Sequence, residues 1–245
     1  MGEELEQIVG AGNNNSLVDM QVDRRGFLAA LLGLTVAATE TSCSPLVPVI
    51  ERLPIAGLNL AEVDNFFYRS AQVNEDDLRY LKTKYSIETV LILRGEHPEE
   101  PWYNKEIKAC EKLGITAQAF SFSSKYPSKP DVYIAYITAL EQNKHTVKLV
   151  HCRSGAERSS LASAFYVLAT GGNLSDAKHE LDSIHSFVSK YSYMRRLIND
   201  IWQFVNGRED RTTAMKEFFS SQEYLRFYEA LNPDAKNEKL ATSGK

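Results

Sequence analysis

Residues 146–159 read TVKLVHCRSGAERS. The first half is short, β-branched and apolar, which predicts a buried strand. The chain continues as SSLASAFYVLA in residues 159–169, which predicts an apolar helix. A tight loop between them holds Cys152 at its start, Gly155 in its middle and Arg158 near its end. A glycine at that place permits a positive φ and the close approach of a ligand to the backbone.

The loop has the properties of an oxyanion site. A loop that enters a helix N-terminus points free backbone N–H groups inward, and the helix dipole adds positive potential. Arg158 offers a bidentate fork for two phosphate oxygens. The same field favours the thiolate of Cys152, the nucleophilic form, and the Ser159 hydroxyl can donate to it and make it a better leaving group. An inert cysteine at a strand end, the alternative, needs neither the glycine nor the arginine.

The pattern His151-Cys152-x-x-Gly155-x-x-Arg158-Ser159 resembles the signature of Cys-based protein tyrosine and dual-specificity phosphatases. Further motifs at residues 68–72 (YRSAQ), 93–96 (LRGE) and 101–103 (PWY) occur in the order seen in bacterial relatives of the plant-and-fungal atypical dual-specificity phosphatases. The resemblance covers about residues 55–205. It implies a compact α/β phosphatase domain, a phosphocysteine intermediate and no metal or other cofactor.

The candidate site follows from this loop. Cys152 is the expected nucleophile, Arg158 the expected phosphate clamp and Ser159 the donor to the thiolate. His151 is expected to order the loop through its ring N–H groups rather than to transfer protons. Arg94 can supply positive potential at the mouth of the site, although a surface arginine is the commoner case. The loop residues expected to bind substrate are Arg153, Ser154, Gly155 and Ala156.

The general acid has no obvious place. Dual-specificity phosphatases usually carry an Asp upstream of the cysteine, but residues 120–126 read FSFSSKY and hold no carboxylate. Glu157, inside the loop, is the candidate that we include among the catalytic residues, with a structural ion pair to a neighbouring cation as the alternative. Glu96 is a second candidate, with a solvated turn carboxylate as the alternative. Asp131 is a third, and we favour a helix N-cap for it.

Composition and periodicity predict the fold class. The chain has 245 residues, 43% hydrophobic and 24% charged, which fits one globular domain with tails. Strands alternate with helices up to residue 173, which predicts an α/β fold with a central, mostly parallel sheet flanked by helices. The part beyond is predicted to be helical, over residues 175–186, 193–204 and 211–231. The predicted strands are 66–70, 89–93, 115–122 and 146–151, and the earlier helices 75–84, 103–113, 131–142 and 159–169.

We expect three segments along the chain. Residues 1–54 are predicted to be a disordered N-terminus, a signal and a linker, residues 55–232 the phosphatase domain, and residues 233–245 a disordered tail. Within the first segment, the apolar run 27–38 is too short to span a bilayer but fits the core of a signal peptide.

Arg24 and Arg25 precede that apolar run, as in the twin-arginine export signal of bacteria. This predicts a periplasmic protein, or one associated with the inner membrane through its N-terminus. A cytoplasmic protein with an N-terminal amphipathic helix is the alternative. Met20 as the true start and Cys43 as a lipidation site are further options, although no aliphatic residue stands three positions before Cys43.

Charge and cysteine usage exclude other classes. A net charge of −4 gives no indication of nucleic-acid binding, and the three cysteines match no metal site or disulfide framework. The sequence therefore predicts Cys-dependent hydrolysis of phosphomonoesters of the phosphotyrosine type, with a phosphorylated protein or small molecule as partner. The alternatives are a phosphate-binding module without turnover, an inositol phosphate or pyrophosphate phosphatase, and a sulfurtransferase with a persulfide on Cys152.

Overall fold

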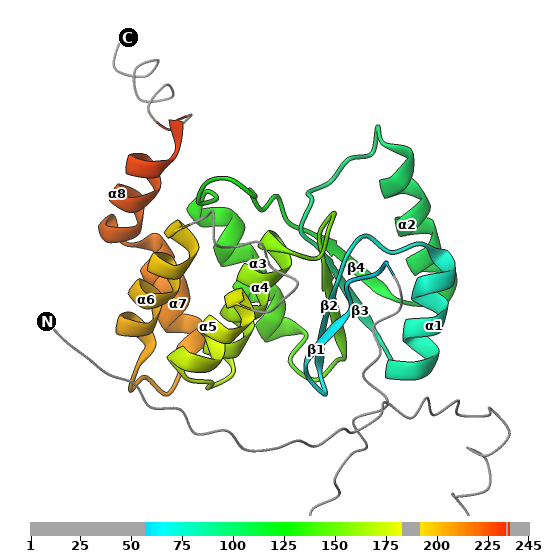
Figure 1. Cartoon of the computed structure of the whole chain (residues 1–245), viewed down its shortest axis with the longest axis horizontal. Helices are drawn as coiled ribbons and strands as arrows, with labels where there is room; N and C mark the ends of the chain where they lie inside the picture. Colours follow the sequence, from blue (N-terminus) through cyan, green and yellow to red (C-terminus); the bar gives the residue numbers. More distant parts are fainter. Residues whose placement is uncertain (1–56, 183–191, 234, 236–245) are drawn as a thin grey trace, which may run out of the picture. The chain divides into compact units, whose positions relative to one another are not determined.

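The computed structural model describes residues 57–182, 192–233 and 235, which Figure 1 shows in colour. The predicted signal segment, Cys43 and almost all of the predicted tail lie outside these residues. Within the described part, no helix is both long and apolar enough to cross a bilayer.

A five-stranded sheet forms the centre of the fold, in the order β1-β2-β5-β3-β4. The first two strands are an antiparallel hairpin, and β2, β5, β3 and β4 run parallel to one another. The predicted class, α/β with a mostly parallel sheet, is confirmed. The strands are β1 Ala61–Asp64, β2 Phe67–Ser70, β3 Thr89–Ile92, β4 Thr116–Ala119 and β5 Lys148–His151.

Helices follow the strands, and capping residues fix where several of them begin or end. Asn74 caps α1 with a reciprocal capping box to Asp77, and Gly114 ends α2 in the left-handed conformation. The helices are α1 Glu75–Tyr85, α2 Pro101–Leu113, α3 Pro130–Gln142, α4 Glu157–Ala169, α5 Leu174–Asp182, α6 Ser192–Val205, α7 Arg211–Ser220 and α8 Gln222–Leu231.

Alternating strand residues build one core on each face of the sheet. On one face, Leu91 and Val150 pack in a cluster with residues of α3 to α8. On the other, Val90 and Leu149 pack with residues of α1 and α2. Figure 1 shows α1 and α2 on one side of the sheet and the remaining helices on the other. The carboxyl ends of the parallel strands therefore lie between two layers of helices, which is where ligands bind in such sheets.

Three expectations need correction. Strand β1 was not predicted, because its four residues AEVD alternate between half-buried and exposed and carry little apolar character. The predicted helix 211–231 is two helices, since Ser221 ends α7 and its hydroxyl accepts from Tyr224 N to begin α8. Asp131 is not an N-cap. The cap position is Lys129 and Pro130 occupies the first helical position, so Asp131 lies inside the first turn of α3.

Candidate active site

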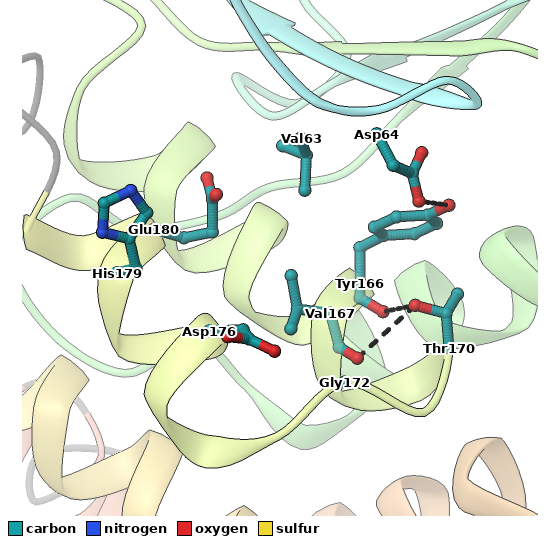
Figure 2. A pocket seen from close by; sticks show the side chains of 9 residues that line it. All are labelled: Val63, Asp64, Tyr166, Val167, Thr170, Gly172, Asp176, His179 and Glu180. Atoms are coloured by element: carbon teal, nitrogen blue, oxygen red, sulfur yellow. Dashed lines mark hydrogen bonds between the residues drawn. The ribbon is translucent and has the colours of Figure 1, made fainter. Parts of the chain in front are cut away.

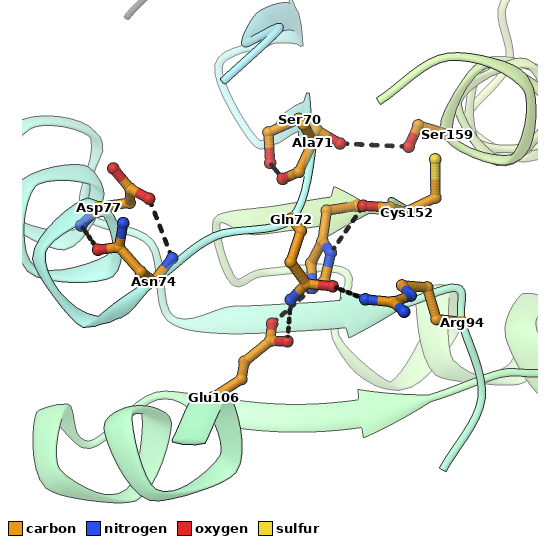
Figure 3. Close-up of polar contacts among 10 residues, drawn as sticks. Ser70, Ala71, Gln72, Asn74, Asp77, Arg94, Glu106, Cys152 and Ser159 are labelled. Carbon is orange, nitrogen blue, oxygen red and sulfur yellow. Dashed lines mark hydrogen bonds and ion pairs between the residues drawn. The ribbon is translucent and has the colours of Figure 1, made fainter. Parts of the chain in front are cut away.

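Cys152 lies directly after β5, at the carboxyl end of the sheet, and the loop from it enters α4. Its side chain is 1% exposed. The thiol faces the start of α4, where Ser159 lies close to it in Figure 3. The strand, loop and helix of the sequence prediction are thus observed in that order, with the helix beginning at Glu157.

The loop environment favours the thiolate of Cys152. Burial is the largest influence and by itself would raise the pKa of the thiol. The hydrogen bond from the Ser159 hydroxyl, the charge of Arg158 and the backbone N–H groups of Ser159 and Ser154 outweigh it, so the pKa falls below its ordinary value. Cys110 has the same 1% exposure in α2, but burial raises the pKa of its thiol to about 12. The loop, not burial, therefore sets the reactivity of Cys152.

Gly155 lets the loop press against the end of β2. It has φ +69°, and a Cβ placed on it would lie 2.6 Å from Ala71 N and 2.7 Å from Ser70 C. Ser159 Oγ lies 3.4 Å from the carbonyl oxygen of Ser70, and Gln72 N donates to the carbonyl of Arg153 at 3.3 Å. The backbone after β2 thus forms one wall of the loop.

Three arginines surround the mouth of the loop. The charges of Arg158 and Arg153 lower the pKa of Arg94, after its partial burial as the largest cause. Arg158 Nη1 donates to the carbonyl of Leu93 at 3.5 Å. Among the residues that the structure describes, no carboxylate forms an ion pair with any of the three guanidinium groups. Their positive charge remains available to an anionic ligand.

Arg94 is held by groups that the sequence did not assign to the site. Its guanidinium lies 3.5 Å from the centre of the Trp102 ring, and its Nη1 donates to Gln72 Oε1 at 2.7 Å. Gln72 in turn contacts Glu106, and Glu106 contacts His151. Trp102 therefore supports the arginine. Trp102 and Gln72 belong to the PWY and YRSAQ motifs that the sequence analysis noted. Glu106 is one of several charged residues in its helix and belongs to no motif, so it was not predicted.

The three candidate acids lie in different surroundings. Glu157 is half-buried at the first position of α4, and among the described residues it has no ion-pair partner. Glu96 is exposed after β3 and lines a cavity of about 320 Å³ together with Tyr103 and Gln118. Asp131 is exposed in α3. The loop between β4 and α3, where a general acid was expected, is held by a serine side chain. Ser128 Oγ accepts a hydrogen bond from Ser123 N at 2.9 Å.

A second cavity, of about 330 Å³, lies on another part of the molecule, between β1 and helices α4 and α5 (Figure 2). Asp64, Asp176 and Glu180 line it, and Tyr166 donates to Asp64 Oδ2 at 2.7 Å. No residue of the signature loop borders it. Within the described ranges, no three His, Cys, Asp or Glu side chains are grouped so that they could hold a metal ion.

Comparisons with known proteins add the following findings. No protein-family model matches the sequence, and a search of curated proteins finds no match. Among solved structures, the chain is similar to the core catalytic domain of the PP-IP phosphatase SIW14 from S. cerevisiae. The identity is 17%, the match covers 66% of this chain and 94% of that chain, and the TM-score is 0.49.

Two further neighbours are bacterial. TpbA from P. aeruginosa is 16% identical over 67% of this chain and 92% of that chain, with a TM-score of 0.45. A putative phosphatase from Shewanella putrefaciens CN-32 is 18% identical over 60% of this chain and 95% of that chain, with a TM-score of 0.48.

Proposed function

We propose that this protein is a Cys-dependent phosphatase that hydrolyses phosphomonoesters through a phosphocysteine intermediate. The observation that carries the proposal is the contrast between two equally buried thiols. Burial raises the pKa of Cys110 to about 12, whereas Ser159, Arg158 and the loop N–H groups lower the pKa of Cys152 despite its burial. A lowered pKa in an oxyanion-binding loop is the requirement for a thiolate that attacks phosphorus.

The reaction has two displacements on phosphorus. The Cys152 thiolate attacks, an S–P bond forms, and the bond between phosphorus and the leaving oxygen breaks, so that the leaving group takes the electron pair. Water then attacks the same phosphorus and gives up a proton, and the S–P bond breaks with its electron pair on sulfur. Inorganic phosphate is released, and the Ser159 hydroxyl donates to the thiolate that forms again. Arg158 and the loop N–H groups stabilise the equatorial oxygens in both steps.

The test uses p-nitrophenyl phosphate with three variants of the full chain. Cys152→Ser is expected to abolish turnover while tungstate, a phosphate mimic, still binds. Arg158→Lys is expected to fail as well, because a point charge does not replace the planar fork. Cys110→Ala, which removes the other buried thiol, is expected to retain activity. Near-wild-type hydrolysis by Cys152→Ser would show that Cys152 is not the nucleophile.

The same assay separates the remaining alternatives. A wild-type chain that binds tungstate but releases no phosphate from any ester or anhydride would be a binding module. Sulfur transfer from thiosulfate to cyanide without phosphate release would indicate a persulfide on Cys152.

A second substrate class, phosphoanhydrides such as inositol pyrophosphates, is favoured by one specific observation. Arg94, Arg153 and Arg158 surround the loop, and no described carboxylate forms an ion pair with them. SIW14 is named as a PP-IP phosphatase, and one TpbA structure holds pTyr, so these two classes are the ones to compare. The ratio of kcat/KM for an inositol pyrophosphate to that for a phosphotyrosine peptide decides between them.

A further inference from the structure

Glu106 is a buried charge that the signature does not explain. It is 2% exposed, and it is the only acidic residue in the described ranges that is buried. It lies in the middle of α2, in the layer of helices on the face of the sheet opposite to α4. Burying a carboxylate costs several kcal/mol unless it is paired and hydrogen-bonded. Its partners therefore define its role.

The first partner of Glu106 is the histidine of the loop. His151 is fully buried, and its Nε2 lies 2.6 Å from Glu106 Oε1. Its Nδ1 lies 3.4 Å from the carbonyl oxygen of Cys152. The two ring nitrogens thus face a buried carboxylate and the carbonyl of the nucleophile itself. The contact with Glu106 fixes the orientation of the ring next to the backbone of Cys152.

The second partner leads to the mouth of the site. Gln72 Nε2 donates to Glu106 Oε2 at 2.5 Å, and Gln72 Oε1 accepts from Arg94 Nη1 at 2.7 Å. The side-chain amide is therefore fixed in one orientation, with its donor towards the carboxylate and its acceptor towards the guanidinium. Figure 3 shows Gln72 between Glu106 and Arg94. The Glu106 carboxylate thus holds His151 directly and holds Arg94 through Gln72.

We propose that Glu106 is a positioning residue that sets the ring of His151 and the guanidinium of Arg94 as one unit around Cys152. The carboxylate does not touch the reacting atoms. It acts on the loop through the ring of His151, and on the charge of Arg94 through the amide of Gln72. The proposal concerns the same site as the proposed phosphatase function, and it rests on that function only where a KM is measured.

The charges around Cys152 fix the direction of the expected effect. Arg158 from α4, Arg69 from β2 and Arg94 after β3 all interact with the thiolate, and Glu106 is the nearby anion. Removing the carboxylate also removes the contact that orients the ring of His151 next to the backbone of Cys152. The Cys152 side chain then loses its fixed place among the Ser159 hydroxyl and loop N–H groups that lower its pKa. The net result is a less stabilised thiolate.

The first experiment measures the alkylation of Cys152 by iodoacetamide against pH, in a Cys43→Ser background of the full chain. Cys110, whose thiol pKa Glu106 and Glu111 also raise, is followed separately by peptide mass spectrometry. Glu106→Gln keeps the size of the side chain and removes its charge. We expect the midpoint of the alkylation profile to move to higher pH by about one unit. The matched control is Glu111→Gln, an exposed glutamate in the same helix, which is expected to keep the wild-type midpoint.

The second experiment separates the two branches. Gln72→Leu breaks the link to Arg94 and leaves the contact between Glu106 and His151 in place. It is expected to raise KM about tenfold, with kcat nearly unchanged and a smaller rise of the alkylation midpoint than Glu106→Gln, since Arg94 keeps its charge and loses only its fixed position. Glu106→Gln is expected to move both KM and the midpoint. A role in stability alone would change neither.

A third variant covers the case in which Glu106→Gln does not fold. Glu106→Asp keeps the charge and shortens the side chain by one methylene, so that the carboxylate no longer reaches both His151 and Gln72. We expect it to move the midpoint and KM in the same direction as Glu106→Gln. A folded Glu106→Gln or Glu106→Asp chain with wild-type midpoint and KM would overturn the proposal. The alkylation results hold whether or not phosphate is released, so failure of the phosphatase assay is a distinct outcome.

Discussion

At Gly155 the geometry of the loop leaves no room for a side chain. Its φ is +69°, and a Cβ would meet the backbone at Ala71 N (2.6 Å) and Ser70 C (2.7 Å), which cannot turn away as a flexible side chain would. We expect Gly155→Ala to lower the free energy of unfolding by about 3 kcal/mol, combining φ strain with overpacking. Phosphatase activity should fall with it, because the loop can relax only by moving the N–H groups that bind phosphate.

The control for this change is Gly207→Ala. Gly207 has φ +79° and nothing within 4 Å of its would-be Cβ, so it carries the backbone strain alone. We expect a loss of about 1 kcal/mol and unchanged activity. Equal losses at the two glycines in thermal unfolding would show that contact with the end of β2 is unimportant.

Glu157 allows a test of how the leaving group is protonated. A general acid contributes roughly 10²–10⁴-fold when the leaving group is poor and little when it is a stable anion. If Glu157 donates the proton, Glu157→Gln slows an alkyl phosphate by about 10²-fold and leaves p-nitrophenyl phosphate nearly unchanged. The measurement is kcat/KM for both substrates across the acidic limb of the pH profile, with Glu223→Gln, an exposed glutamate of α8, as the control.

Other outcomes reassign the role of Glu157. Equal losses on both substrates would mean that Glu157 orders the loop. No loss on either would leave Glu96 and Asp131, and Glu96 comes first because it follows β3 at the carboxyl edge of the sheet.

The site residues that the sequence revealed are those that share one loop. Cys152, Arg158 and Ser159 lie within eight positions, and their spacing alone indicates the chemistry. Glu106 could not be found in this way. It meets His151 only because α2 folds back over the sheet, and among the other charged residues of this helix, such as Lys105 and Lys108, it has no distinctive local pattern. Long-range pairing is a property of the fold, not of a short sequence window.

At the scale of elements, Arg69 ties β2 to α4 and α5. The side chain is 1% exposed, and its Nη1 donates to Ser160 Oγ at 2.6 Å and to the carbonyl of Glu180 at 3.1 Å. The same nitrogen lies 3.7 Å from Glu180 Oε2. Burial lowers the pKa of Arg69 and raises that of Glu180, so each group depends on the other to stay ionised.

We therefore expect Arg69→Met to destabilise the fold by about 3 kcal/mol, because it leaves the partly buried carboxylate of Glu180 without its cation. Glu180 can escape by taking up a proton, since its pKa is already raised in the fold, so the loss should be smaller near pH 5 than near pH 8. The double change Arg69→Met/Glu180→Gln should recover most of the stability at pH 8. Additive losses in denaturant unfolding would show that the two side chains act independently.

The elements that were predicted correctly carry their signals locally. Helix α1 has its Asn74 cap, α2 its C-terminal Gly114, and β3 its run of buried aliphatic residues. Strand β1 gave no signal, because it is fixed by antiparallel pairing with β2 and not by its own composition. The break at Ser221 was missed since SSQEY reads as a continuous helix unless the serine hydroxyl turns back to cap the next one.

At the scale of the whole molecule, the C-terminal helices complete the core around α4. Phe219 of α7 lies 5.0 Å from Tyr133 and 5.5 Å from Phe165, measured between ring centres, and Tyr224 of α8 lies 5.0 Å from Phe219. The hydroxyl of Tyr224 donates to the carbonyl of Ser128 at 2.5 Å, which ties α8 to the loop before α3. These helices support the same α4 whose first turn holds Arg158 and Ser159.

Two truncations test this organisation. Residues Ile50–Lys245 form one unit, and both hydrophobic clusters lie within it, so a chain that begins at Ile50 should keep the free energy of unfolding and the kcat/KM of the full chain. A chain that ends at Asp210 lacks Phe218, Phe219 and Tyr224. Each large side chain contributes roughly 1.5–3 kcal/mol by burial, which together approaches the roughly 5–15 kcal/mol that holds a domain folded. We expect no cooperative thermal transition from it. A cooperative transition with retained activity would show that α1 to α6 suffice to hold the signature loop.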